Sequence, residues 1–236
     1  MSTYSKAGVD IDAGNTAVEL MKAHLKRARR PEVIGDIGGF AGLFDVSALK
    51  KFKKPLLATS TDGVGTKTEI ARQLNKYDTI GDDLVAMVVD DLVVCGAEPL
   101  FMTDYIAVGK VFPERIAEIV SGIARGCEKA GTALVGGETA EHPGLLKEDE
   151  FDIAGAATGA VDEEKLLGEH RIKEGDALIA MPSSGFHANG YSLIRYILNN
   201  QKLKLDEKIT NKTLGEILIT PTEIYSLDCL ALARGM

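Results

Sequence analysis

The sequence contains no tryptophan, and aromatic residues make up only 6% of its 236 residues. Proteins that bind single-stranded nucleic acid stack the bases on aromatic side chains, so this composition disfavours that class. The net charge of −8 argues in the same direction, because nucleic-acid binding requires a basic surface. We therefore expect no nucleic-acid partner, although a local basic pocket is compatible with this charge.

Cysteine is also scarce. Cys95, Cys127 and Cys229 are far apart and form no CxxC pair, which disfavours a disulfide framework or a zinc site. We interpret them as small buried hydrophobic residues of a protein in a reducing compartment. The N-terminus lacks the basic and apolar regions of a signal peptide, and no run of about 18 apolar residues could span a bilayer. The sequence predicts a cytoplasmic protein without a membrane partner.

The remaining composition, 45% hydrophobic and 26% charged, is that of an ordinary globular protein, and the length suits two domains. Strands and helices alternate in the first part of the chain, which predicts an α/β fold. The pattern gives helices at 15–30, 79–95 and 113–131, and strands at 55–61, 100–108, 132–136 and 152–161.

A charged segment that contains few apolar residues, 161–176, separates this part from the rest. We place the N-terminal domain at residues 1–171. Residues 172–236 contain one expected strand, 177–181, and helices at 190–199 and 222–233. A single strand in so short a segment makes a marginal core, so we interpret it as the start of an incomplete α+β domain.

The segment TDGVGTK, residues 61–67, follows an apolar run that we expect to be a buried strand. Asp62 at its end could hold Mg²⁺, which prefers oxygen ligands. Gly63 and Gly65 allow a ligand to approach the backbone, and Thr66 and Lys67 offer a hydroxyl and a positive charge. The order of residues is not that of a P-loop. Taken alone, the segment is also compatible with a simple strand-to-helix connection.

Further acidic residues follow. The segment GGETAE, residues 136–141, is expected to deliver Glu138 at the end of another strand, so that Asp62 and Glu138 occupy the edge where open α/β sheets bind ligands. Asp90 and Asp91 lie in the last turns of a helix, where only one of them can face a given site, or they form a solvated face. Converging carboxylates repel one another unless a divalent cation neutralises them. These residues together predict Mg²⁺ and a phosphate substrate.

The segment SSGFHANGYS, residues 183–192, precedes the helix expected from residue 190. Hydroxyls and backbone N–H groups at a helix N-terminus bind anions, so Ser184 and its neighbours could hold a phosphate, or the loop could present His187 to a substrate. A structural or solvated His187 is the alternative. The basic run 26–30 could likewise bind phosphate or simply complement its helix dipole.

These motifs, together with GVDIDAGN at 8–15 and DxxxxGAxP at 91–99, stand in an order that resembles the phosphoribosylformylglycinamidine cyclo-ligase family of de novo purine synthesis. The resemblance covers almost the whole chain. Related ATP-using families, such as selenophosphate synthetase and thiamin-monophosphate kinase, share mainly the DGxGTK-like and GAxP-like signals. The segments GVDIDAGN and SSGFHANGYS therefore favour the cyclo-ligase.

The resemblance implies an ATP- and Mg²⁺-dependent ring closure. The formyl oxygen of formylglycinamidine ribonucleotide is phosphorylated, the ring nitrogen attacks the activated carbon, and phosphate leaves as aminoimidazole ribonucleotide forms. It also implies a mixed N-terminal sheet with flanking helices, through which two chains form a homodimer.

The resemblance also implies roles for individual residues. Asp62, Asp91 and Glu138 match positions expected to hold Mg²⁺ and the ATP phosphates. Residues expected to contact ATP or its phosphates are Lys22, Asp12, Gly14, Gly63, Gly65, Thr66, Lys67 and Ser184, with Asp12 and Gly14 in a flexible cover over the nucleotide. Residues expected at the reacting groups are His187, as a proton-transfer group, Asn189 and Lys22.

The sequence departs from the family at its C-terminal end, where the family's second domain continues beyond the position of Met236. We therefore expect a fragment, or a chain that a partner completes. Two alternative functions stay open at this point. One is a non-catalytic, dimerising, nucleotide-binding fragment, and the other is a related small-molecule kinase of the same superfamily.

Overall fold

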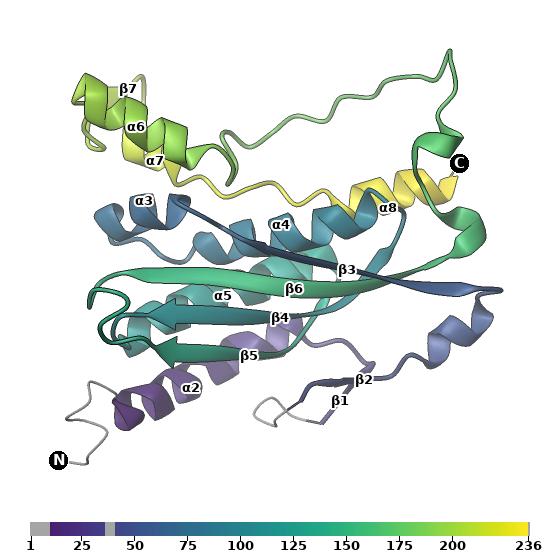
Figure 1. The fold of residues 1–236 in the computed structure, drawn as a ribbon, viewed down its shortest axis with the longest axis horizontal. Helices are drawn as coiled ribbons and strands as arrows, with labels where there is room; N and C mark the ends of the chain where they lie inside the picture. Colours follow the sequence, from purple (N-terminus) through teal and green to yellow (C-terminus); the bar gives the residue numbers. More distant parts are fainter. Residues whose placement is uncertain (1–9, 36–40, 236) are drawn as a thin grey trace.

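A computed structural model describes residues 10–35 and 41–235 of the chain. Its centre is a four-stranded mixed sheet in the order β3 (Pro55–Gly63), β6 (Phe151–Asp162), β4 (Glu98–Val108) and β5 (Ala133–Glu141) (Figure 1). Strand β6 is antiparallel to both of its neighbours, and β4 is parallel to β5. Strands β3, β4 and β5 therefore all end at the same edge of the sheet. The expected mixed α/β architecture is confirmed.

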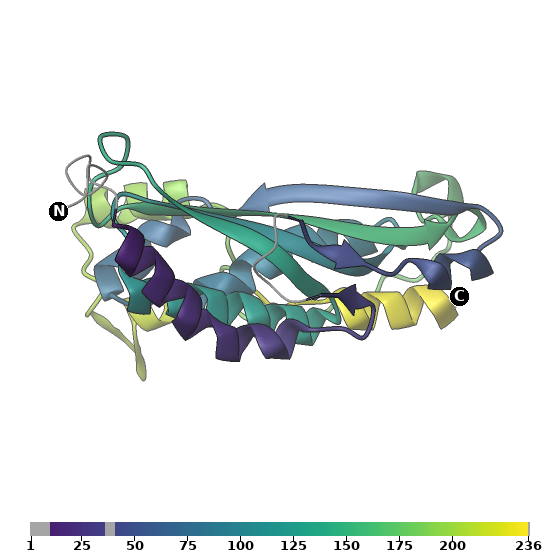
Figure 2. The same ribbon diagram turned by 90° about the horizontal axis from the view of Figure 1, so that it is seen from below.

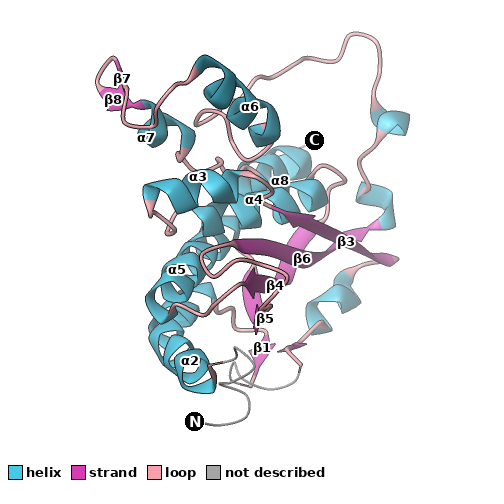
Figure 3. Ribbon diagram, turned by 60° about the vertical axis from the view of Figure 1, so that its left-hand side comes forward, coloured by secondary structure: helices cyan, strands magenta, loops and turns pink. Residues whose placement is uncertain are grey.

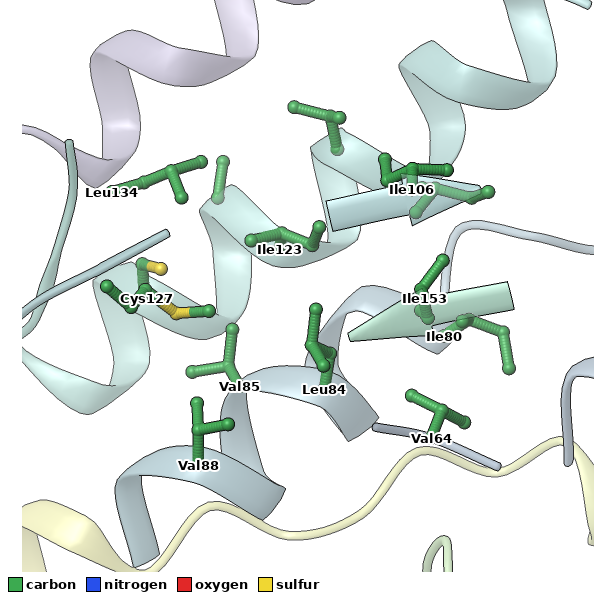
Figure 4. Close-up of a cluster of buried hydrophobic side chains, with 14 of the residues drawn as sticks. Val64, Ile80, Leu84, Val85, Val88, Ile106, Ile123, Cys127, Leu134 and Ile153 are labelled. Atoms are coloured by element: carbon green, nitrogen blue, oxygen red, sulfur yellow. The ribbon is translucent and has the colours of Figure 1, made fainter. Parts of the chain in front are cut away.

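Three helices lie together on one face of this sheet: α2 (Ile11–Leu25), α4 (Ile80–Val93) and α5 (Pro113–Ala130) (Figures 2 and 3). The core fills the space between them and the sheet. Figure 4 shows Leu84 and Val85 of α4 close to Ile123 and Cys127 of α5, with Ile153 of β6 beside them. The thiol of Cys127 is fully buried, as its interpretation as a small hydrophobic residue required.

Several helix ends follow local rules. Pro113 stands in the first turn of α5, and Gly131 ends this helix in the left-handed conformation, with φ of 67°. Asp10 caps α2 by accepting a hydrogen bond from Ala13 N, which starts this helix four residues earlier than expected. Residues 11–15 of the GVDIDAGN segment are therefore helical, and Asp12 and Gly14, expected in a cover over the nucleotide, lie near the start of α2. Residues 8 and 9 of that segment lie outside the described residues.

Two expected strands differ from the structure. Strand β3 is not buried, because it is an edge strand whose side chains alternate between the helices and solvent, and Leu57 is 67% exposed. Strand β5 continues through Gly136 and Gly137 to Glu141, because these residues stay paired with β4. Glu138 thus lies inside a strand and not beyond its end.

Short elements fill the connections. They are β1 (Val33–Ile34) paired with β2 (Leu43–Phe44), helix α3 (Lys67–Leu74), and 3₁₀ turns at Lys26–Ala28, Ser47–Lys51, Glu163–Lys165 and Glu169–Arg171. The glycine-rich segment 35–43 can be described only at its two ends, since residues 36–40 lie outside the described residues.

The chain after residue 171 contains less regular structure than expected. Residues 177–181 form no strand, because no other described strand pairs with them, and Leu178 is 100% exposed. Helix α6 (Tyr191–Gln201) confirms the expected helix at 190–199. It is followed by β7 (Lys208–Ile209), β8 (Lys212–Thr213), α7 (Leu214–Leu218) and α8 (Ser226–Gly235).

Helix α8 begins four residues later than expected, because the backbone N–H of Thr222 donates to Asp83 instead of entering a helix. Helix α8 itself packs on α4 and α5. No helix in the described ranges is long and apolar enough to cross a membrane.

Candidate active site

The strand register brings the expected acidic residues to one level of the sheet. Asp62 of β3 pairs with Gly155 of β6, which pairs with Asp104 of β4, which in turn pairs with Gly137 of β5. Glu138 is one position further along, beside Tyr105. Asp62 and Glu138 are therefore at the same edge of the sheet, as the sequence analysis expected.

They do not share a face, however. Residues that pair across a sheet project to the same side, and successive residues of a strand project to opposite sides. Asp62 and Asp104 belong to the row that faces the helices, together with the buried Gly155. Glu138 and Tyr105 belong to the next row, which faces the open side of the sheet. The three carboxylates expected to hold Mg²⁺ do not converge within one chain.

Asp91, in contrast, contacts the strand that carries Asp62. Its carboxylate accepts a hydrogen bond from Ser60 Oγ at 2.8 Å, and Ser60 is two residues before Asp62 on the same face of β3. Asp90 points elsewhere and accepts the backbone N–H of Tyr225 at 3.2 Å. Burial raises the pKa of Asp90 to about 6. Of the two adjacent aspartates, Asp91 is therefore the one that faces the strand carrying Asp62.

The chemistry of these donors limits what kind of metal site they could form. In the described part of the chain, no group of three or more His, Cys, Asp or Glu side chains lies close enough together to hold a metal ion. Mg²⁺ commonly uses one or two carboxylates and completes its shell with water and substrate phosphates. The pair Asp62 and Asp91 fits such a site, whereas Glu138 belongs to the opposite face.

A cavity of about 900 Å³ lies between α2 and β5, and it collects a second group of expected residues. Gly14 and Lys22 of α2 line it together with Glu138, and its walls include apolar residues such as Met21 and Leu134. The ammonium of Lys22 is exposed and forms an ion pair with Glu19 at 2.6 Å. Lys22 and Glu138, which are far apart in sequence, thus share one cavity. Because β5 is an edge strand, Glu138 can line this cavity at the border of the sheet although its row faces away from the helices.

Asp104, which belongs to none of the motifs described above, lines the same cavity. Burial raises the pKa of its carboxyl group to about 7, opposed only by a hydrogen bond from its own backbone. The signal in the sequence is its spacing. Met102, Asp104 and Ile106 alternate along β4, and the two hydrophobic members are fully buried, so the aspartate between them must share their face.

The TDGVGTK turn lies against the loop 183–190. Gly65 takes the left-handed conformation, with φ of 67°, and the hydroxyl of Thr66 lies 3.1 Å from that of Ser192. Asp62 Oδ1 accepts the backbone N–H of Gly63 at 2.7 Å. The Thr66–Ser192 contact joins the turn to the first turn of α6, which directly follows the loop 183–190.

Lys67, which was expected to neutralise phosphate charge, lies inside the protein. Its side chain is fully buried, and its ammonium forms an ion pair with Asp83 at 2.9 Å. Asp82 is also fully buried, between Arg125 and Lys129. The acidic residues early in α4 are therefore paired with basic side chains inside the protein.

His187 also has a defined environment. Its Nε2 accepts the backbone N–H of Ser184 at 3.3 Å, and its ring centre lies 6.0 Å from that of Tyr225. The hydroxyl of Ser184 donates to the carbonyl of Pro221, and the Asn189 amide lies 3.8 Å from the sulfur of Met87 in α4. The structure thus brings Ser184 and His187 together and places Asn189 over α4.

Comparison with known proteins identifies the family. The description "AIR synthase related protein, N-terminal domain" matches residues 45–161, and the corresponding C-terminal domain matches residues 173–236. The phosphoribosylformylglycinamidine cyclo-ligase of Desulfitobacterium hafniense is 57% identical over 233 residues, which cover 99% of this chain and 68% of that protein. The chain belongs to the phosphoribosylformylglycinamidine cyclo-ligase family. This cyclo-ligase family member thus spans about two thirds of the length of its relative.

Solved structures share the fold at low sequence identity. The thiamine-monophosphate kinase of Stenotrophomonas maltophilia has a TM-score of 0.58 and 18% identity, with 93% of this chain and 64% of that chain covered. The hydrogenase maturation protein HypE in complex with ATP has a TM-score of 0.52 and 19% identity, with 89% and 57% covered. The cyclo-ligase family chain therefore has the architecture of this wider group.

Proposed function

We propose that this chain carries out the ATP-dependent cyclisation of formylglycinamidine ribonucleotide to aminoimidazole ribonucleotide in purine biosynthesis. The family membership supports the reaction, because the 57% identical relative is named for it. The observation on which the assignment rests is the position of Asp91 of α4 against Ser60, on the face of β3 that carries Asp62 just before the glycine-rich turn. The ATP complex of HypE, which shares the fold, supports ATP as the co-substrate.

The reaction requires a poor oxide leaving group to be converted into phosphate, which leaves more readily. The protein assists this conversion by positioning the reactants and by stabilising the charge on the phosphate. Mg²⁺, when bound, would neutralise phosphate charge, and Asp62 and Asp91 would hold it. Backbone groups of Gly63 and Gly65, with the hydroxyl of Thr66, would contact the phosphates. Lys22 supplies an exposed ammonium from the cavity wall.

The loop 183–190 is proposed to contact the nucleotide substrate. Because Nε2 of His187 accepts a hydrogen bond, the neutral ring carries its proton on Nδ1. The Nδ1–H of His187 can therefore donate a hydrogen bond to a substrate group and hold it in place, and Nε2 is the atom that would take up a proton in a transfer step, while Ser184 and Asn189 provide polar contacts. Asp12 and Gly14, near the start of α2, would lie beside the nucleotide in the same scheme.

The test of this function is formation of aminoimidazole ribonucleotide from formylglycinamidine ribonucleotide and Mg·ATP. We expect Asp62→Asn to lower kcat by about 100-fold or more, since it removes a carboxylate beside the phosphate site. Asp176→Asn, in an exposed turn, is the matched control and should leave turnover unchanged.

Three other outcomes would contradict the proposal in distinct ways. A folded wild-type chain that forms no product would be a nucleotide-binding fragment and not a complete cyclo-ligase. ATP-dependent phosphorylation of a small molecule without ring closure would identify a related kinase. Equal activity of the wild-type and Asp62→Asn chains would remove Asp62 from the site.

We also propose that residues 1–171 and 172–236 are separate domains and that two chains dimerise through the open face of the sheet. The two matched family domains, which end at 161 and begin at 173, support the division. The open face carries exposed apolar side chains, with Leu57 67% and Tyr105 41% exposed. Such side chains would be covered in a face-to-face pair of sheets.

Sedimentation equilibrium tests the dimer. The wild-type chain is expected to sediment as a dimer, and Leu57→Asp as a monomer, because the substitution would bury a charge between the sheets. Leu178→Asp, at a fully exposed position away from the sheet, should leave the dimer intact. A wild-type monomer, or a dimer unaffected by Leu57→Asp, would contradict this arrangement.

A further inference from the structure

The buried ammonium of Lys67 is fully occupied by three oxygen atoms from distant parts of the chain. It donates to Asp83 at 2.9 Å, to the carbonyl of His187 at 2.8 Å and to the carbonyl of Thr220 at 2.7 Å. A protonated lysine has three donors, so none is left for a phosphate. The side chain also has no exposed surface from which a ligand could approach it.

Asp83 completes this junction. The same carboxylate oxygen that pairs with Lys67 accepts the backbone N–H of Thr222 at 2.8 Å and the Thr222 hydroxyl at 2.6 Å. Its second oxygen is buried without a partner among the described residues. Burial lowers the pKa of Lys67 and raises that of Asp83, and each charge offsets the shift of the other. One ion pair therefore joins α3 and α4 to two separate stretches of the chain after residue 171.

One of the two carbonyls that Lys67 contacts belongs to a residue with an unfavourable backbone. His187 has φ of 57°, in the left-handed region, where residues other than glycine are uncommon and carry an energetic cost. Such a conformation persists only when the surroundings hold it. Its carbonyl is held by Lys67, and its ring by the Ser184 N–H and by Tyr225. The direction of the imidazole thus depends on the backbone that Lys67 fixes.

We infer that Lys67 is a positioning residue for His187 and not a phosphate ligand. It acts by holding the carbonyl of His187, so that the loop 183–190 presents the imidazole in one orientation. The inference rests on the proposed function in one respect, namely that His187 takes part in the reaction.

The experiment compares Lys67→Met, Asp83→Asn and the double variant. Each single variant leaves one buried charge unpaired and should be poorly stable. The double variant removes both charges, while the amide oxygen introduced at position 83 can still accept from Thr222, so it should recover stability over the single variants. It nevertheless lacks the donors to His187 and Thr220.

Kinetics of the stable double variant separate three roles. A positioning role predicts that kcat falls about 100-fold, since misplacing a reacting group by about 1 Å costs this much, while the Kd for ATP changes less than about threefold. A phosphate ligand would instead weaken ATP binding by about tenfold or more, as expected for a lost charged contact. A merely structural role would let kcat recover together with stability. The last two outcomes would overturn the inference.

A second readout does not depend on turnover. The chain has four histidines, so ¹⁵N-imidazole NMR can resolve His187, with His187→Gln for assignment. At a pH at which the imidazole is neutral, the wild type should show a single tautomer protonated on Nδ1, and the double variant a mixture of tautomers with exchange of the Ser184 amide at least about tenfold faster. An unchanged His187 signal in the folded double variant would refute the inference. If the wild type fails to turn over while these signals change, only the proposed function fails.

Discussion

A Gly81→Ala variant is expected to lose more than about 4 kcal/mol of its free energy of unfolding, enough to leave the chain largely unfolded. Helices α4 and α5 cross at Gly81 and Gly122, where their backbones touch. A methyl group on Gly81 would overlap the backbone of Gly122 and Ile123 and would lie 2.6 Å from the carbonyl oxygen of Ile119. These atoms belong to the buried core of α5, so the helices would have to separate.

Urea denaturation followed by circular dichroism measures this effect, and Gly14→Ala provides the matched control. Gly14 also lies in a helix, but nothing surrounds the position of its missing Cβ within 4 Å. Alanine there should stabilise the chain by about 0.5–1 kcal/mol, because it restricts the unfolded state and favours helix. Similar stability of the two variants would show that α4 and α5 do not cross in this way.

Asp104→Asn should change how the free energy of unfolding depends on pH. Burial raises the pKa of Asp104 to about 7, whereas an unfolded aspartate titrates near 4. Between these values the folded chain retains a proton that the unfolded chain has released. The stability contributed by this group is therefore present at low pH and is lost as the pH rises toward 7, by up to about 4 kcal/mol.

The variant lacks this titration. Between about pH 4 and pH 7, the free energy of unfolding of the variant should therefore rise relative to that of the wild type. Above about pH 7 the difference between the two proteins should become constant. Urea titrations of both proteins at several pH values measure the difference, in which other groups such as Asp90 cancel. Parallel curves for the two proteins would show that Asp104 is not buried in its protonated form.

Local signals in the sequence predicted several elements well. Helix α5 was predicted closely because Pro113 and Gly131 mark its two ends. Strand β6 was predicted to within one residue at each end because its apolar run is long and flanked by charged segments. The expected strand at 177–181 has an equally apolar sequence, yet a strand requires a neighbour to pair with, and a single segment contains no information about one.

In the candidate site, too, some features could be predicted from the sequence and others depended on distant parts of the chain. The sequence placed Asp62 and Glu138 at one edge of the sheet, since that follows from strand order and direction. It did not predict their opposite faces, because these depend on register, and β4 carries an irregularity between Met102 and Thr103 in its pairing with β5. A shift of one residue moves a side chain to the other face. The burial of Lys67 was equally hidden, since two of its partners follow it by more than a hundred residues.

The position of β6 has a consequence for how the chain folds. This strand comes last among the four in sequence but lies between β3 and β4, and its pairing with β3 joins Pro55 to Asp162. A nascent chain therefore emerges with β3 unable to join the sheet until about a hundred further residues have been synthesised. Contacts of such long sequence separation slow folding, so the segment from α4 to β5, whose contacts are more local, is the part that can assemble first. Insertion of β6 then completes the sheet as the final step of its assembly.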